Sequence, residues 1–427
     1  MRQMIMTMTQ FTKSFNMKIP NCRLCRGPLS PPKLSFPATP LANQFLSHMD
    51  KQDTFPLQVC TCETCGHYQL DELIDPELLF RDYLFVAGTS PVNVEHFRRY
   101  AVEVVEKFDV KKNSKVLDIA SNDGTLLKHF QDLGMEVLGI DPAKNISDEA
   151  NAKGIKTIPE FFTEEYADTL LQEYGTFDIV TANNVFAHVP DMIGFTKGVR
   201  KILAPNGVYC FEVSYLGDVC DKVLFDTIYH EHSSYHTITP LALFFFRYGL
   251  RLKDVQRIDT HGGSIRVFVE HFRSYEYLSA THPIRQAHKR IEDLIEAEKD
   301  ISERVELLKN KVNKLGEDLN TRLRQLKSEG KSIAIYGTPA KATTLMYALE
   351  IDTSLIDFAV DDSPLKQGRF TPGKQIKILH PDAIYEKHPD VLLVLAWNFA
   401  DPIIKKHKNF KGTWIVPIPD FREIDAT

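Results

Sequence analysis

The segment SKVLDIASNDGTLLKHFQDLGMEVLGIDPAKN, residues 114–145, constrains the fold more than any other part of the chain. An apolar run ends at Asp118, a polar turn and a helical pattern follow, and a second apolar run ends at Asp141. This order predicts strand, loop, helix and strand, the opening unit of a doubly wound parallel sheet. Such sheets bind nucleotides at the carboxyl end of the first strand, and an acid after the second strand is placed to hold a ribose diol.

The polar turn, DIASNDG, helps to choose the nucleotide. NAD-binding turns follow G-x-G-x-x-G, because the pyrophosphate must touch the loop backbone. Here Ala120 stands where the first glycine would be, and Asp123 lies inside the turn. The acid would repel an anion but not a cationic sulfonium with an amino-acid tail, so the turn favours S-adenosylmethionine. The alternative is a turn that binds no nucleotide.

Five of the seven cysteines lie within residues 22–65, which points to metal rather than disulfides in a reducing compartment. Two C-x-x-C pairs supply the four thiolates that structural zinc sites use. Cys60 offers a different second ligand, but a C-x-x-C pair followed by Gly66 forms a tight turn that aims backbone N–H groups at the sulfurs. The expected ligands of one structural zinc ion are Cys22, Cys25, Cys62 and Cys65. The alternative is a group of reduced, buried cysteines without metal.

Two further patterns organise the second half of the chain. Residues 283–328 are charged, with apolar positions recurring at threes and fours, which predicts a helical connector broken near Gly316 or, as the less favoured alternative, a coiled-coil surface for a partner. The last hundred residues open a second strand, turn and helix unit with Gly337 in its turn and Lys341 at its helix start. A helix N-terminus with one lysine suits a phosphate group. A packing domain with a chance lysine is an equal alternative.

The stretch FDTIYHEHSSYHT, residues 225–237, is the densest in chemically versatile side chains. It follows a late strand of the predicted sheet and so lies over the carboxyl edge, where substrates of open α/β folds bind. Three interpretations compete. His230, His232 and His236 have an H-x-H-x3-H spacing that can hold a metal ion. A polar loop is the second interpretation, and the third is acid–base chemistry, in which an imidazole near a carboxylate and a phenol takes a proton from carbon.

A series of motifs in this order closely resembles the sugar C-methyltransferase family: CRLC, PLANQFL, CETCGHYQL, LFRDYLFVAGTS, VLDIASNDGTLL, GIDP, NNVFAHVPD, YHEHSSYHT, GGSIRV and IYGTPAKATTL. The resemblance covers nearly the whole chain after Ile19 and implies an α/β protein in three parts. The expected parts are a small zinc-binding domain at 19–80, a Rossmann-like methyltransferase domain at 81–282 and a Rossmann-like C-terminal domain at 329–427. A helical connector at 283–328 joins the last two, and residues 1–18 are expected to be a disordered extension.

The resemblance also implies a substrate, a nucleotide-linked 4-keto-6-deoxy sugar carrying TDP or GDP, methylated on C3. His232 would remove the C3 hydrogen, supported by Glu231 and Tyr229, to give an enediolate. Tyr83 and His188 would position the sugar or stabilise charge on its oxygen. The residues expected to hold the adenosylmethionine are Asp118, Ala120, Ser121, Asn122, Gly124, Asp141 and Asn183. Those expected to hold the nucleotide are Gly337 and Lys341.

His230 is the member of the stretch that is least expected to matter. An O- or N-methyltransferase on the same scaffold is one alternative, although it would not need a base for a carbon acid. A zinc-stabilised binding protein without catalysis is the other.

Composition excludes other classes of function. A net charge of −6 offers no basic surface for nucleic acid. The longest apolar runs are shorter than the roughly 20 residues that span a bilayer, and the N-terminus lacks the apolar core of a secretory signal. We therefore expect a cytoplasmic protein without a nucleic-acid or membrane partner. We also expect a monomer, because the long helical region can pack within its own chain.

Overall fold

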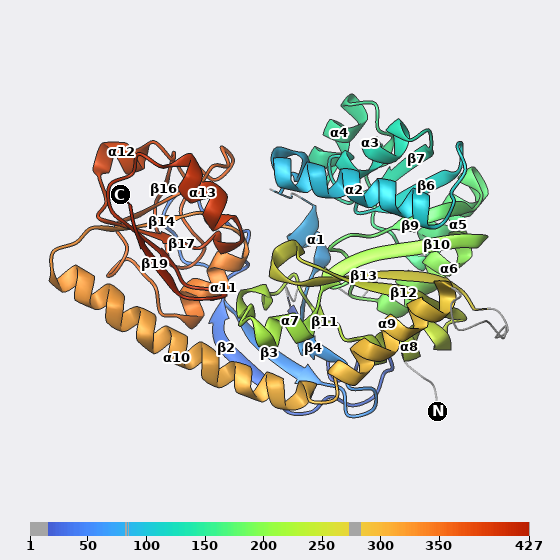
Figure 1. Cartoon of the computed structure of the whole chain (residues 1–427), viewed down its shortest axis with the longest axis horizontal. Coiled ribbons are helices and arrows are strands. Elements are labelled where there is room, and N and C mark those ends of the chain that lie inside the picture. The colour runs from blue at the N-terminus through green and yellow to red at the C-terminus, as the bar shows by residue number, and fades with distance from the viewer. Residues whose placement is uncertain (1–15, 82, 84, 273–282, 427) are drawn as a thin grey trace.

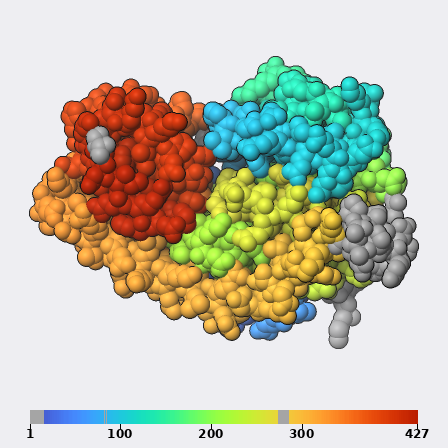
Figure 2. All heavy atoms as spheres, in the orientation of Figure 1, coloured from blue at the N-terminus to red at the C-terminus, as the bar shows by residue number. Residues whose placement is uncertain are grey.

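The computed structural model describes residues 16–81, 83, 85–272 and 283–426, and it forms two lobes joined along one side (Figure 1). Figure 2 shows a hollow between the C-terminal lobe and the central domain. Residues 1–15 of the predicted extension lie outside the described residues. Asn16–Lys18, which the sequence assigned to that extension, form strand β1 and pair with β5 (Glu72–Ile74), so the ordered chain already includes them.

The N-terminal domain is built on a four-stranded antiparallel sheet in the order β11-β4-β3-β2. Its strands are β2 (Leu34–Thr39), β3 (Phe55–Thr61), β4 (Tyr68–Leu70) and β11 (Ser234–Tyr235), and helix α1 spans Pro76–Phe80. The edge strand β11 comes from the stretch at residues 225–237, far along the chain. Ser234 pairs with Gln69 and Tyr235 with Tyr68. The N-terminal domain therefore holds this stretch by backbone pairing.

Seven strands form the central sheet in the order β12-β13-β10-β9-β6-β7-β8. The strands are β6 (Lys115–Ile119), β7 (Glu136–Ile140), β8 (Thr157–Ile158), β9 (Phe177–Thr181), β10 (Leu203–Ser214), β12 (Leu250–Ile258) and β13 (Ser264–His271). All paired strands are parallel except β13, which is antiparallel to β10 and β12. The predicted α/β class is confirmed, with Asp118 near the end of β6 and Asp141 directly after β7.

Helices cover both faces of the central sheet (Figure 1). They are α2 (Pro91–Lys107), α3 (Thr125–Asp132), α4 (Lys144–Ala152), α5 (Glu164–Tyr174), α6 (Met192–Ile202) and α8 (Ile238–Arg247). Helix α7 (Leu216–Asp221) packs instead in a core shared with the N-terminal and C-terminal domains. Tyr100 of α2 and Phe130 of α3 are fully buried in one core, and Leu170 of α5 and Phe245 of α8 in the other. Two separate cores are what a sheet buried on both faces requires.

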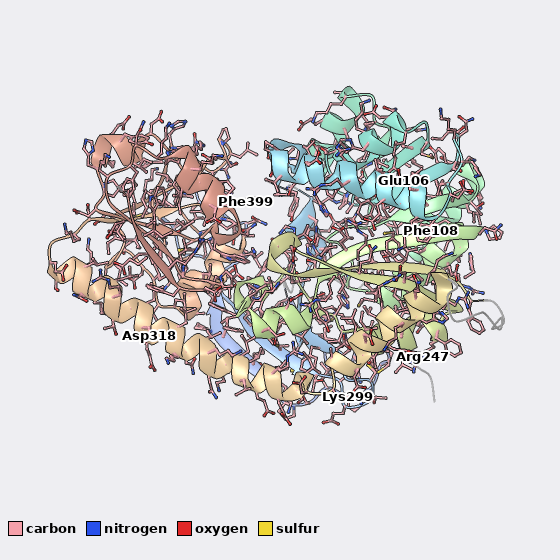
Figure 3. The ribbon with its side chains drawn as sticks, in the orientation of Figure 1. Glu106, Phe108, Arg247, Lys299, Asp318 and Phe399 are labelled. Carbon is pink, nitrogen blue, oxygen red and sulfur yellow. The ribbon has the colours of Figure 1, made fainter. Side chains whose placement is uncertain are left out.

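The connector consists of α9 (Pro283–Ala297) and α10 (Ile301–Ser328), so the predicted break near Gly316 is wrong. Lys299 marks the real break, and Asp318 lies on the exposed side of α10 (Figure 3). The buried Glu298 carboxylate accepts hydrogen bonds from the backbone N–H groups of Ile238, at 2.8 Å, and Thr239, at 3.3 Å. A carboxylate is favourable at the N-terminus of a helix, here α8, and this contact explains why the connector bends there.

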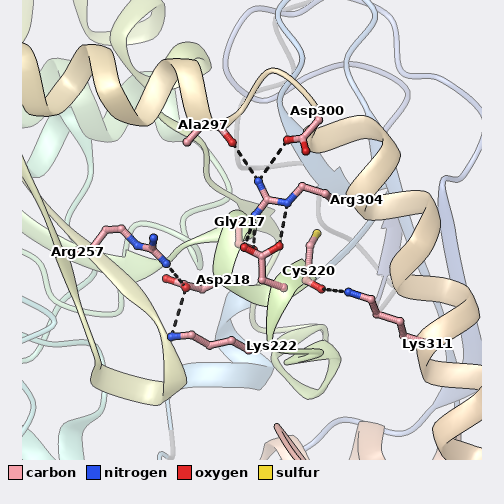
Figure 4. Close-up of polar contacts among 10 residues, drawn as sticks. Gly217, Asp218, Cys220, Lys222, Arg257, Ala297, Asp300, Arg304 and Lys311 are labelled. Carbon is pink, nitrogen blue, oxygen red and sulfur yellow. Dashed lines mark hydrogen bonds and ion pairs between the residues drawn. The ribbon is translucent and has the colours of Figure 1, made fainter.

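Arg304 fixes the first turn of α10 (Figure 4). Its guanidinium donates to the carbonyls of Ala297 and Gly217 and pairs with Asp221 at 2.7 Å. Six apolar residues of α10 are buried within the chain, although Leu307 is exposed, and this burial favours the connector over a coiled-coil surface. They are Val305, Leu308, Val312, Leu319, Leu323 and Leu326.

The C-terminal domain has a six-stranded sheet in the order β16-β15-β14-β17-β18-β19, parallel except for β19. Its strands are β14 (Ile333–Tyr336), β15 (Phe358–Val360), β16 (Ile378–Leu379), β17 (Val391–Val394), β18 (Thr413–Val416) and β19 (Arg422–Asp425). Its helices are α11 (Lys341–Ala348), α12 (Ala383–Lys387) and α13 (Ala400–Lys406). The chain leaves β14 toward β15 and later returns to β17 on its other side. This reversal opens a crevice at the carboxyl ends of β14 and β17, where such folds bind ligands.

Within the described residues, every helix is either too short or too polar to cross a lipid bilayer.

Candidate active site

A cavity of about 2710 Å³ lies between the central and C-terminal domains. Asp118 and Asp141 line it from the central sheet, and His232 lines it from the stretch at residues 225–237. Gly337 and Phe399 line it from the C-terminal domain, and Phe399 stands on the side of that domain that faces the central domain (Figure 3). The two turns that the sequence predicts to bind ligands therefore face one space.

The four predicted metal ligands come together in the N-terminal domain. Their sulfur atoms all lie within 4.8 Å of one another, and Cys22 Sγ is 3.7 Å from Cys65 Sγ. This spacing matches the edge of a tetrahedron of zinc–sulfur bonds of about 2.3 Å. The backbone N–H groups of Leu24 and Thr64 donate to Cys22 and Cys62 Sγ, which stabilises thiolates. Cys60 lies in β3 outside this group, so the structure brings together the four cysteines that the sequence analysis preferred.

The turn after β6 is held in a shape that leaves polar atoms at the cavity. Ala120 and Asn122 adopt left-handed backbone conformations, with φ of 55° and 51°. Ala120, Ser121 and Asn122 all line the cavity, and the buried Ser121 hydroxyl has no hydrogen-bond partner among the described residues. The same holds for both side-chain polar atoms of Asn183, after β9. Unpaired buried polar atoms around one space fit a polar ligand.

Acidic groups dominate this part of the cavity. Burial raises the pKa of Asp118 to about 7, although a hydrogen bond from the Thr181 hydroxyl, 2.6 Å long, acts to lower it. Burial also raises the pKa of Asp141, although its carboxylate accepts from the backbone N–H groups of Asn122 and Ala143. Among the described residues, neither of these two buried carboxyl groups has a basic partner. Such a pair suits a ligand with cationic groups and a diol, and S-adenosylmethionine carries both.

Two residues of the turn differ from their predicted place. Asp123 was expected to repel an anion, but its carboxylate accepts from Thr125 Oγ1 and pairs with Lys153 at 3.2 Å, away from the cavity. Gly124 does not line the cavity either. Its φ is +78°, and a Cβ there would lie 2.8 Å from a methyl carbon of Ile155, so the loop itself requires a glycine at this position.

His232 lies at the centre of an aromatic and imidazole cluster. Its Nε2 is 3.0 Å from the Tyr229 hydroxyl, and its ring centroid is 4.8 Å from that of His188. Burial lowers the pKa of His232 well below its usual range, helped by the neighbouring His188, while a hydrogen bond to the Thr227 carbonyl opposes this shift. Burial lowers the pKa of His188 to about 4. Both imidazoles are therefore neutral near pH 7. Because the His232 ring donates its one N–H to the Thr227 carbonyl, its Nε2, which the Tyr229 hydroxyl contacts, carries the lone pair that can accept a proton.

Glu231 belongs to a second group, separate from His232. Its carboxylate accepts from the Asn43 side-chain amide at 2.7 Å and from the Tyr83 hydroxyl at 3.2 Å. Burial raises the pKa of Glu231 to about 7, while these two hydrogen bonds hold it down. Tyr83 and Asn43 line the cavity and Glu231 lies behind them. Glu231 therefore contacts the cavity wall through Tyr83 and Asn43, and among the described residues its side-chain hydrogen bonds go to these two and not to His232.

The other two histidines of the stretch point to separate neighbours. His230 Nε2 contacts the Pro56 carbonyl at 3.1 Å, and the ring packs against Phe55. His236 is fully buried against His67 and Phe186. Within the described residues, the four cysteines alone form a group with metal-binding geometry, so the three histidines do not.

The C-terminal domain contributes Gly337 and Lys341, and the two differ in what they offer. The Gly337 N–H donates to the Val360 carbonyl, and a Cβ there would lie 2.4 Å from Ala396 Cβ. Gly337 thus lines the cavity without a free amide for a phosphate. Lys341 lies beside Asp226 and Trp397, next to the stretch that carries His232.

The sequence missed several contributors to this site. Asn43 lies in a loop of the N-terminal domain, and its contact with Glu231 gives no local signal; only its place in the motif PLANQFL marked it. His261, which follows β12, lines the cavity, and burial lowers its pKa to about 4. Asp226 and Trp397 meet through a hydrogen bond from Trp397 Nε1, 2.6 Å long, that joins the central and C-terminal domains.

Three families of known proteins match successive parts of the chain. Residues 22–80 match the family described as "Putative zinc binding domain", and residues 94–255 match "Methyltransferase domain". Residues 259–419 match "C-methyltransferase C-terminal domain". Together these matches follow the order that the motifs predict.

One relative matches the chain from end to end. The C-methyltransferase NovU of Streptomyces niveus is 34% identical over 418 residues, which span 96% of this chain and 97% of that protein. The ubiquinone biosynthesis O-methyltransferase of Proteus mirabilis (strain HI4320) is 28% identical over 106 residues, 24% of this chain and 43% of that protein. A solved S-adenosylmethionine-dependent methyltransferase from Clostridium acetobutylicum ATCC 824 covers 42% of this chain and 92% of its own at 14% identity, with a TM-score of 0.35, too low to argue from.

Proposed function

The chain belongs to the C-methyltransferase family, and from this premise we propose that it methylates C3 of a nucleotide-linked 4-keto-6-deoxy sugar. The nucleotide is TDP or GDP. S-adenosylmethionine supplies an electrophilic methyl group, and the chain supplies the base that turns the sugar carbon into a nucleophile. One observation carries the proposal: the Tyr229–His232 pair and the acidic turn around Asp118 and Asp141 face the same cavity.

The neutral His232 ring is the base. The 4-keto group acidifies the C3 hydrogen, and His232 takes this proton while the C–H electron pair moves into the sugar to give the enediolate. Tyr229 shares a hydrogen bond with His232 Nε2 and so orients the ring. A positioned base of this kind contributes about 10²–10⁴-fold to a rate.

Tyr83 and His188 hold the sugar from two sides. Tyr83 donates its hydroxyl proton to Glu231, so its oxygen lone pairs remain free to accept a hydrogen bond from a sugar hydroxyl. His188 Nε2 has no hydrogen-bond partner among the described residues and lies beside His232, where it can bond a sugar oxygen. Both contacts would fix the C3 hydrogen toward the base.

The four cysteines would hold one structural zinc ion in the N-terminal domain. A site ligated entirely by protein leaves no open position for a substrate, so the metal would stabilise the fold and take no part in the transfer. Arg23, next to Cys22, donates to the Ser233 carbonyl at 3.0 Å. The metal site would in this way support the stretch that carries His232.

The substitution His232→Asn tests the function. The protein is incubated in deuterated water with TDP- and GDP-linked 4-keto-6-deoxyhexoses, and deuterium at C3 is measured by mass spectrometry and NMR. We expect wild-type exchange at C3 and methyl transfer from labelled S-adenosylmethionine, with both lost in His232→Asn while binding of S-adenosylhomocysteine persists. His230→Asn, two residues away and outside the cavity, is the matched control.

Each competing function gives a different result. Methyl transfer without C3 exchange would indicate an O- or N-methyltransferase. Neither reaction in the wild-type protein, with sugar and cofactor both bound, would indicate a binding protein. Full activity of His232→Asn would remove His232 from the role of base.

A further inference from the structure

Lys341 is a buried lysine whose amino group is incompletely paired, and burial lowers the pKa of this group while the neighbouring Asp226 opposes the shift. Its side chain is 11% exposed, and its Nζ has no hydrogen-bond partner among the described residues. The nearest carboxylate oxygen, Asp226 Oδ2, is 3.8 Å away, beyond hydrogen-bond distance. Burying an ammonium whose N–H donors are unpaired costs free energy of folding. A site that retains such a group is therefore suited to a ligand with an anionic or strongly polar acceptor.

Two neighbours hold this ammonium in place from behind. It stands 4.4 Å from the centroid of the Trp397 ring, and Trp397 Nε1 donates to the same Asp226 oxygen at 2.6 Å. Lys341 and Trp397 belong to the C-terminal domain, whereas the fully buried Asp226 lies three residues before Tyr229. Asp226 does not line the cavity and Lys341 does. The charge is therefore fixed at the cavity wall by a contact between two domains.

The neighbours of Lys341 on the cavity side are the groups of the proposed reaction. Its charge helps to lower the pKa values of both His232 and His261. Thr227, His232, His261 and Lys341 all line the same cavity. The ammonium lies beside Asp226, which precedes His232 by six residues in the same stretch, whereas the turn at Gly337 has its amide already bonded to Val360. This placement favours the reacting end of the sugar over its diphosphate.

The geometry points to Lys341 as the group that stabilises the oxyanion of the enediolate, a role that rests on the proposed function. When His232 takes the proton, the C–H electron pair becomes the C3–C4 double bond and the carbonyl electron pair moves onto the C4 oxygen. Lys341 donates a hydrogen bond to that oxygen and keeps its proton. As the new C3–CH₃ bond forms, the carbonyl is restored and the pair from the broken sulfur–methyl bond stays on sulfur.

A preorganised donor at a developing oxyanion is worth about 10²–10³-fold in rate. We therefore expect Lys341→Met, which keeps the length of the side chain and removes the charge, to slow C3 deuterium exchange at saturating sugar by about this factor. The exchange is measured without a methyl donor, so it reports deprotonation alone. Binding of TDP and GDP, measured by calorimetry, should be unchanged, because these ligands lack the keto sugar.

Lys374→Met is the matched control. Lys374 lies in the same domain with its ammonium 4.5 Å from the Tyr347 ring, but it does not line the cavity. We expect its exchange rate to equal that of the wild-type protein. If the melting curve shows that Lys341→Met does not fold, Lys341→Arg is used in its place. Its guanidinium would place the donor away from the position of the ammonium, so we again expect slower exchange with unchanged binding of TDP and GDP.

Two results would overturn the inference. Exchange at the wild-type rate in the Lys341 variant would show that the ammonium does not stabilise the oxyanion. Loss of TDP or GDP affinity would assign Lys341 to the diphosphate. Failure of the proposed function is recognised separately, because the wild-type protein would then exchange no C3 hydrogen with any of these sugars.

Discussion

Asn43→Ala tests whether the N-terminal domain takes part in the chemistry. The Asn43 amide donates to Glu231 at 2.7 Å, and this hydrogen bond helps to hold the pKa of Glu231 at about 7 despite burial. A hydrogen bond to a charged group contributes about 1.5–3 kcal/mol, and one pKa unit corresponds to about 1.4 kcal/mol. Loss of the Asn43 hydrogen bond would raise the pKa of Glu231 by about 1–2 units. We expect a rise of about 1 unit, because water can enter the space that Asn43 leaves beside the cavity.

The direction of the pH effect follows from the ionised form of Glu231, which accepts the Tyr83 hydroxyl. Activity that needs this carboxylate is present above its pKa and lost as the pH falls. In the wild-type protein kcat/KM for methyl transfer should therefore fall below a pH of about 7. In Asn43→Ala the fall in kcat/KM should begin near pH 8. At pH 7 about one tenth of the Glu231 carboxyl would be ionised, compared with about one half in the wild-type protein, which gives an approximately fivefold loss of kcat/KM.

The assay is a pH profile of kcat/KM from pH 5.5 to 9.5 with labelled S-adenosylmethionine and the accepted sugar. Gln44→Ala is the matched control, since Gln44 is the next residue in the loop and its side chain is exposed. The two variants should converge with the wild-type protein at the alkaline end. An acid limb that does not move in Asn43→Ala would refute the reasoning, and so would an equal loss at every pH.

Three further predictions concern single groups. Tyr229→Phe should lower the rate of C3 exchange by about 10²-fold or more, because the Tyr229 phenol orients His232. The affinity for S-adenosylhomocysteine, measured by calorimetry, should be unchanged. An unchanged exchange rate would argue against that role. Cys25→Ser should lower both the zinc content, measured by elemental analysis, and Tm, whereas Cys60→Ser should retain the metal. Glu231→Gln should leave the free energy of unfolding in urea unchanged at pH 4 and raise it by up to about 3 kcal/mol at pH 8. The reason is that wild-type stability falls as the pH rises from about 4.5 to about 7 and the buried Glu231 carboxyl ionises. Equal stability of the two proteins at pH 8 would contradict a raised pKa of Glu231.

Local patterns in the sequence predicted the parts of the structure that depend on neighbours in the chain. Asp118 and Asp141 follow from strand ends in one βαβ unit, and the four cysteines from C-x-x-C spacing. The contact of Asn43 with Glu231 joins positions 188 apart, and nothing in the residues around either position announces it. The helix break was predicted near Gly316, but α10 continues through that glycine, and the connector bends where the Glu298 carboxylate bonds to Ile238, 60 positions away.

The three parts of the chain are best understood through what carbon methylation requires beyond methyl transfer to oxygen. When the nucleophile is already reactive, a cofactor site alone is sufficient. The part of this chain that matches "Methyltransferase domain" is limited to residues 94–255. A carbon acid also needs a base in a fixed place, and the pairing of β11 with β4 holds the stretch that carries His232. In the proposed reaction it needs, in addition, a cation near the developing oxyanion, which Lys341 offers from the C-terminal domain. The N-terminal and C-terminal domains supply these two requirements from opposite sides of the same stretch. Their separation from the central domain should therefore abolish carbon deprotonation before it abolishes cofactor binding.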